Sequence, residues 1–184
     1  MMTAHFLKFG AALMLAAPLI GGQAYAAGGG GSDTPPTQTQ TSKDCKKGQV
    51  WNSQTKKCVK AQSGMMDDDT LFEAARELAY FDRHEEAIDL LKMAANQNAP
   101  RILNYLGFSN RKAGRMDVAM GYYRQALAID PEYTLARSYY GQALIDTGDI
   151  KGAQAELAAI RRIAGPANYP YFALAQSLRS GKTY

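Results

Sequence analysis

Reactive side chains are scarce in this chain. Its 184 residues include two histidines, two cysteines and one tryptophan. The sequence has no glycine-rich phosphate loop, no nucleophile elbow and no His-Glu-x-x-His helix motif. An enzyme needs a convergent set of nucleophile, base and charge-stabilising groups. We therefore predict that the chain is not an enzyme and uses no cofactor.

Metal sites are not predicted either. His5 falls in the N-terminal segment described below, and His84 stands beside two glutamates, a pattern typical of a solvated surface histidine. The acidic run 67–69 lacks the alternating ligand spacing of a calcium loop. Negative charge there instead suits the positive end of a helix dipole.

Charge of one sign is also in short supply. The formal net charge is only +4, and it is not concentrated in one basic run, so nucleic acid is not predicted as a partner. Hydrophobic residues make up 46% of the chain, which predicts a folded core. The length suits one ordinary domain.

The N-terminal segment predicts export. Lys8 precedes an apolar run over 9–20, and Ala24-Tyr25-Ala26 follows. This is the layout of a secretory signal peptide over 1–26, with cleavage after Ala26. A membrane anchor is the alternative, but the run is short and Pro18 interrupts it. We predict a periplasmic or secreted protein with no stable membrane insertion after cleavage.

Residues 27–44 predict a disordered linker, because they are rich first in glycine and then in Thr, Gln and Pro. Cys45 and Cys58 follow as the only cysteine pair. In an oxidising compartment such a pair is expected to form a disulfide.

The cysteine-bounded loop 45–60 predicts a small β-hairpin. Val50 and Trp51 precede an Asn-Ser-Gln-Thr turn, and Val59 follows it. Five lysines make the loop basic. One interpretation is a contact loop for an anionic surface or a glycan, with Trp51 stacking on the ligand. The other, which we favour, is a staple that stiffens the linker and carries solvated lysines.

Helical periodicity begins at Asp67. It predicts three helix pairs, over 68–81 with 85–96, 101–113 with 117–129, and 134–146 with 150–163. Short turns make each pair antiparallel. An amphipathic helix over 168–180 follows.

The helix pairs repeat with a period of about 34 residues. The clearest unit, 100–133, carries small, large and turn residues at fixed places: Leu103, Leu106, Gly107, Gly114, Ala119, Tyr123, Ala126 and Pro131. This pattern resembles the tetratricopeptide repeat family. In the first unit Asp82 stands where the turn glycine is usual, and in the third Ile160 replaces an alanine.

The resemblance implies an all-α fold, a helix–turn–helix solenoid over 67–180. Its repeats are 68–99, 100–133 and 134–167, and 168–180 is a capping helix. Gly107 and Ala119 are expected to be small because the two helices of a unit cross closely there.

The resemblance also implies a concave groove, lined by the first helix of each unit, that binds an extended peptide or a partner's helix. Register assigns these groove positions: Phe72, Arg76, Ala79, Tyr80, Arg101, Asn104, Tyr105, Phe108, Arg111, Lys112, Leu135, Ser138, Tyr139, Gln142, Ile145 and Asp146. For each aromatic residue, packing between adjacent helices is an equal alternative. Phe72 and Ser138 replace polar residues of the family's carboxylate clamp, so binding of chaperone tails is not predicted.

Three functions remain open. The first is an adaptor or scaffold that holds a partner protein in the groove. The second is a self-associating structural subunit of a cell-envelope assembly. The third is a surface-binding protein that uses the basic loop 45–60.

Overall fold

The structure is a computed structural model that describes residues 34–62 and 64–184. The predicted signal peptide and residues 27–33 lie outside the described residues. The elements follow in the order α1 (Gln40–Lys43), β1 (Gln49–Asn52), β2 (Lys57–Lys60), α2 (Asp68–Tyr80), α3 (His84–Leu91), α4 (Pro100–Lys112), α5 (Met116–Ile129), α6 (Thr134–Asp146), α7 (Ile150–Ala164) and α8 (Tyr169–Ser180).

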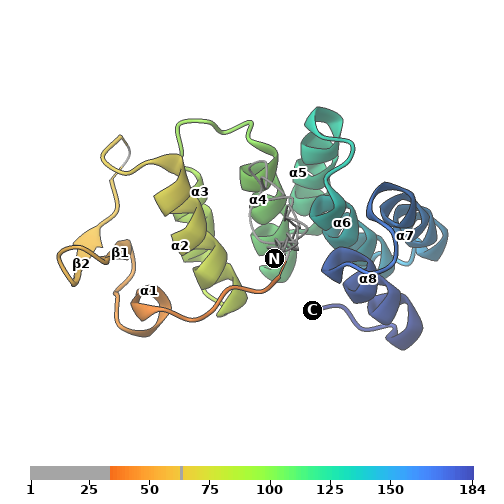
Figure 1. Cartoon of the computed structure of the whole chain (residues 1–184), viewed down its shortest axis with the longest axis horizontal. Helices are drawn as coiled ribbons and strands as arrows, with labels where there is room; N and C mark the ends of the chain where they lie inside the picture. Colours follow the sequence, from red (N-terminus) through yellow and green to blue (C-terminus); the bar gives the residue numbers. More distant parts are fainter. Residues whose placement is uncertain (1–33, 63) are drawn as a thin grey trace, which may run out of the picture.

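The described part of the chain is mostly helical and forms a row of helix pairs, which fits the predicted all-α repeat fold. Helices α2 and α3, α4 and α5, and α6 and α7 pack as hairpins, and α2, α4 and α6 also contact one another in sequence. Helix α8 packs against α6 and α7 at one end of the row (Figure 1). The β-hairpin and α1 lie at the other end, beside α2.

One turn geometry recurs within the three pairs. Asp82, Gly114 and Gly148 all have positive φ, of 58°, 81° and 86°. Each lies between the two helices of its pair, where the chain reverses. Aspartate tolerates this left-handed conformation better than most side chains do. Asp82 therefore performs the role of the turn glycine that the first repeat lacks.

Helix α3 ends earlier than predicted. The periodicity predicted a helix as far as residue 96, but α3 ends at Leu91. The Asp68 carboxylate accepts hydrogen bonds from the backbone N–H groups of Ala95 (2.7 Å) and Asn96 (2.9 Å), so these residues bond to the start of α2. This side-chain contact replaces the last helical turn, because it supplies acceptors outside the helix.

The linker prediction is wrong for part of its length. We predicted disorder over 27–44, but residues 40–43 form the short helix α1, and Thr41 is 4% exposed. The Thr39 side chain caps this helix by accepting a hydrogen bond from Thr41 N–H at 3.1 Å. These polar residues are ordered because Glu77 on α2 and Arg83, in the turn before α3, form hydrogen bonds to them, as shown below.

The predicted hairpin and disulfide are present. Strands β1 and β2 pair antiparallel, with Val50 opposite Val59 and Trp51 opposite Cys58. Cys45 and Cys58 form the disulfide, which ties the hairpin to the end of α1. Within the described residues, no helix combines the length and hydrophobicity needed to span a membrane.

Close packing explains the glycine of the central repeat. A Cβ built on Gly107 meets the Tyr123 ring at 2.6 Å, and Tyr123 is fully buried. Such a distance requires the ring or the helices to move. The predicted close crossing of α4 and α5 is therefore confirmed.

We expect Gly107→Ala to lower the free energy of unfolding by about 1–3 kcal/mol through overpacking. The matched control is Gly121→Ala on α5, where an added Cβ meets nothing within 4 Å. That change is expected to be neutral or to stabilise by about 0.5–1 kcal/mol, because alanine favours helix. Chemical denaturation measures both. Equal effects of the two variants would contradict the packing argument.

Candidate functional site

The predicted groove residues share one face of the helix row. We call the surface made by α2, α4 and α6 the first-helix face. Its residues come from three successive repeats and meet because α2 contacts α4 and α4 contacts α6. Most of the predicted site residues on it are buried, and the ones that retain some exposure are Tyr80, Arg101, Lys112, Ile145 and Asp146.

The aromatic residues of this face form one connected cluster, which comprises Phe72, Tyr80, Tyr105, Phe108 and Tyr139. Ring centroids lie 5.3 Å apart for Phe72–Tyr105, 5.5 Å for Tyr80–Phe108 and 5.0 Å for Phe108–Tyr139. The hydroxyls of Tyr80 and Tyr139 are 2.5 Å apart and hydrogen-bonded. These contacts join α2, α4 and α6 across the row.

Packing is thus the main role of four of the five rings. Phe72, Tyr105, Phe108 and Tyr139 are each at most 2% exposed, whereas Tyr80 is partly exposed. Burial raises the pKa of Tyr105 to about 12, so its hydroxyl stays protonated at ordinary pH and is available as a donor. Of these rings, Tyr80 alone offers surface to a ligand.

Arg76 is buried at one end of this cluster, with 4% exposure. Its guanidinium donates to the Tyr105 hydroxyl at 3.2 Å and to the Glu73 carboxylate at 3.0 Å. It also donates to the backbone oxygen of Thr34, a residue outside the repeats. Burial acts to lower the pKa of Arg76, but Tyr105 and Glu73 outweigh it and keep the group charged.

Arg111 is buried further along the face, with 6% exposure. It donates to Asp146 on α6 at 2.9 Å and to Gln142 Oε1 at 3.4 Å. A third hydrogen bond, of 2.7 Å, goes to the backbone oxygen of Tyr184. Burial acts to lower the pKa of Arg111, but neighbouring Tyr123 and Asp146 hold it above its usual value.

The segment after α8 therefore lies on the first-helix face. Gly181 ends α8 in the left-handed conformation, and the chain turns back toward α6 (Figure 1). Tyr184 N–H donates to Gln142 Oε1 at 3.3 Å, and the Tyr184 ring packs edge-on against Tyr139 with centroids 6.1 Å apart. The Thr183 hydroxyl donates to Asp146 at 2.7 Å. Sequence reasoning missed Thr183 and Tyr184, for which the only signal was an aromatic residue after a C-cap glycine.

The remaining predicted residues have separate environments. Arg101 pairs with Asp69 and lies over the Phe72 ring, 4.9 Å from its centroid. Asn104 is fully buried and donates to the Tyr133 hydroxyl at 3.5 Å, whereas Lys112 is exposed.

His84 differs from its prediction. It begins α3, and its side chain is only 12% exposed rather than solvated. The ring packs edge-on against Phe108 at 6.2 Å, which brings it to the edge of the aromatic cluster. Burial lowers its pKa. No group of three or more metal-ligating side chains occurs among the residues that the structure describes.

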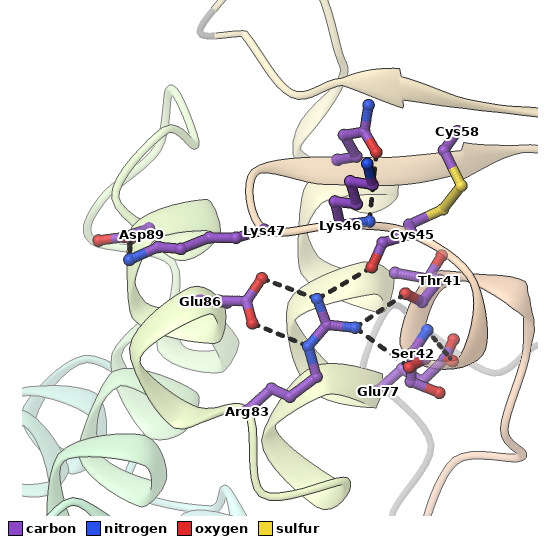
Figure 2. Close-up of polar contacts among 11 residues, drawn as sticks. Thr41, Ser42, Cys45, Lys46, Lys47, Cys58, Glu77, Arg83, Glu86 and Asp89 are labelled. Atoms are coloured by element: carbon purple, nitrogen blue, oxygen red, sulfur yellow. Dashed lines mark hydrogen bonds and ion pairs between the residues drawn. A yellow bond between two sulfur atoms is a disulfide. The ribbon is translucent and has the colours of Figure 1, made fainter.

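A second polar site attaches α1 and the hairpin to the first repeat (Figure 2). The Arg83 guanidinium donates to the backbone oxygens of Thr41 (3.2 Å), Ser42 (3.1 Å) and Cys45 (3.1 Å), and two further bonds of 2.8 Å join it to the Glu86 carboxylate. Arg83 thus satisfies carbonyl groups at the end of α1, which have no partner inside so short a helix.

Glu77 satisfies the opposite end of α1. Its carboxylate accepts from the N–H groups of Thr39 (2.8 Å) and Ser42 (3.0 Å) and from the Thr39 hydroxyl (2.5 Å). Partial burial acts to raise the pKa of Glu77, but the hydrogen bonds from Ser42 and Thr39 outweigh it and lower the pKa below its ordinary value. Both helix ends are therefore bound by charged side chains of the first repeat.

The hairpin presents its lysines to solvent. Lys46, Lys56, Lys57 and Lys60 are exposed, and Lys47 forms a long ion pair with Asp89 at 3.8 Å. Two shallow hollows, of about 390 and 480 Å³, touch Trp51. The hairpin is attached to the first repeat through α1 and through Arg83, which binds the Cys45 oxygen, so the segment that the staple was predicted to stiffen is not a free linker.

A comparison with protein families finds the tetratricopeptide repeat, whose model matches residues 111–177. The match runs from the end of α4 into α8 and supports membership of this family. Tetratricopeptide repeats generally mediate protein–protein interaction and are typically not enzymes. A search of curated proteins found no significant match.

Glu77 makes attachment of the hairpin dependent on pH. Its folded pKa lies below the ordinary value of 4.5, so the stabilisation is complete above about pH 4.5 and is lost as the pH falls through the folded pKa. Emission from Trp51, the only tryptophan, reports the detachment, and circular dichroism at 222 nm reports the repeats.

We expect Glu77→Gln to weaken attachment by about 1–3 kcal/mol, because a charged acceptor of three hydrogen bonds is lost. The acid change in Trp51 emission should then be absent. Glu132→Gln, at an exposed turn residue, is the control and should titrate as the wild type does. Superimposable pH curves for Glu77→Gln and the wild type would show that Glu77 does not hold the hairpin.

Proposed function

We propose that this chain is an exported protein-binding adaptor that holds an extended peptide of its partner on the first-helix face. The observation that carries the proposal is that this face already binds peptide backbone. Two buried arginines, Arg76 and Arg111, donate to backbone oxygens of Thr34 and Tyr184, both outside the repeats.

Backbone oxygens are present in every peptide, and a buried guanidinium that donates to them gives a strong, directional contact. The two arginines flank the aromatic cluster, from which Tyr80 remains partly exposed. A rigid aromatic ring next to a buried arginine is a common energetic centre of protein interfaces. The first-helix face therefore offers both kinds of contact to a partner's extended segment.

The proposal of export rests on the sequence of residues 1–26 and on the Cys45–Cys58 disulfide. A disulfide persists in an oxidising compartment such as the periplasm or the exterior. We place the adaptor there.

A second candidate function is the self-associating subunit. It is favoured by Ile163 and Phe172 near the end of the helix row, which are 36% and 57% exposed. Exposed large apolar side chains at a terminal repeat offer a surface for a second copy.

The test is capture of proteins from an extract of the cells that make this chain. The first-helix variant combines Tyr80→Ala with Lys112→Glu. The control combines Tyr122→Ala with Lys151→Glu, which changes the same residue types on the second helices α5 and α7. We expect a specific set of partners with the wild type and the control, and its loss with the first-helix variant.

Identical protein sets from both variants would contradict the adaptor proposal. No captured protein, together with a concentration-dependent oligomer by light scattering, would favour the self-associating subunit. Circular dichroism of each variant confirms that the helices remain folded.

A further inference from the structure

We propose that the Arg111–Gln142–Asp146 cluster recognises a peptide in which a hydroxyl residue precedes an aromatic residue, and that the chain's own segment Lys182–Tyr184 occupies the cluster in cis. The proposal rests on the proposed function and deepens it, because it names the partner's chemistry and a competitor for the same face.

The cluster contacts each part of a two-residue motif. Arg111 and Gln142 bind the backbone of Tyr184, since the guanidinium donates to its oxygen at 2.7 Å and Gln142 Oε1 accepts from its N–H at 3.3 Å. Backbone contacts of this kind are independent of the side chain and set the position of the peptide.

Two further contacts depend on side chains. The Thr183 hydroxyl donates to Asp146 Oδ1 at 2.7 Å, while Asp146 Oδ2 accepts from Arg111 at 2.9 Å. The Tyr184 ring packs edge-on against Tyr139, and burial raises the pKa of Tyr184 well above its usual value. A hydroxyl residue followed by an aromatic residue is therefore the pattern that this cluster fits.

Within the described part of the chain, the cis segment leaves polar atoms in and beside the cluster without a partner. Gln142 Nε2 and Ser138 Oγ are buried and have no hydrogen-bond partner among residues 34–62 and 64–184. Gln142 and Ser138 are themselves fully buried on α6.

The cis segment is partly exposed to solvent. Gly181 and Lys182 are exposed, and Thr183 and Tyr184 are only partly buried. A tethered segment nevertheless competes at an effective concentration on the order of millimolar. The apparent affinity for a partner is the intrinsic affinity multiplied by the fraction of molecules in which the segment is detached.

The test uses a fluorescein-labelled peptide with the sequence of residues 180–184 and measures its anisotropy with two proteins, the full chain and the chain lacking residues 182–184. We expect the shortened chain to bind the peptide at least about tenfold more tightly. Full-length chain with Tyr184→Ala should behave like the shortened chain, because it keeps the length and loses only the ring contact.

Variants of the peptide and the cluster test recognition. Peptides with Tyr184→Ala or Thr183→Val should each bind the shortened chain about tenfold more weakly. Asp146→Asn in the shortened chain should weaken the parent peptide more than the Thr183→Val peptide, because both peptides share the contact to Arg111, which Asp146 holds, but only the parent peptide has the hydroxyl group. A loss of equal size for both peptides would show that Asp146 does not read the hydroxyl group.

Equal binding of the peptide to the full and shortened chains, or no binding to either at about 1 mM, overturns the inference. If partner capture still depends on Tyr80 and Lys112 in that case, the proposed function survives without it. If the peptide binds as expected but capture is unaffected by the first-helix variant, the tail contact stands and the adaptor proposal fails.

Discussion

A buried guanidinium cannot lose its charge under ordinary conditions, so the surrounding structure must supply acceptors for it. Arg76 and Arg111 impose this requirement on the first-helix face, where each is at most 6% exposed. The repeats provide Glu73, Asp146, Gln142 and the Tyr105 hydroxyl. The remaining acceptors are backbone oxygens of Thr34 and Tyr184, so the face is completed by main chain from outside the repeats.

The same physical arrangement appears at the N-terminal end of the row. Arg83 and Glu77 bind opposite ends of α1 and thereby attach the disulfide-closed hairpin to the first repeat (Figure 2). In each case a charged side chain binds backbone groups of a segment that flanks the repeats. That side chain lies on the first helix of a repeat or in the turn that follows it. The aromatic cluster supplies the rigid support, because its rings join α2, α4 and α6.

Local sequence was sufficient for the features that depend on local spacing. The three helix pairs follow from apolar periodicity, the Asp82 turn from the repeat register, and the hairpin from alternation around a polar turn. The aromatic residues assigned to this face by register do contact one another, whereas Asn104 and Lys112 lie in separate environments. The partner-binding role of all these residues is a proposal.

Contacts between distant segments were beyond the sequence pattern. Tyr184 lies 73 residues from Arg111, and Thr39 lies 38 residues from Glu77, and no periodicity links either pair. The polar segment containing α1 was therefore predicted to be disordered, because it has no apolar residue to bury. It is ordered by hydrogen bonds to charged groups, and this energy does not appear in a hydrophobic pattern.

The central proposal is that the first-helix face binds an extended peptide backbone, and its support is the pair of hydrogen bonds that Arg111 and Gln142 make to the chain's own Tyr184 backbone. The most direct test is nuclear magnetic resonance of the full chain with selectively labelled tyrosine. The account predicts nuclear Overhauser contacts between the Tyr184 and Tyr139 rings, together with slowed exchange of the Tyr184 amide that donates to Gln142. A Tyr184 resonance with random-coil shifts, no contact to Tyr139 and a rapidly exchanging amide would contradict it.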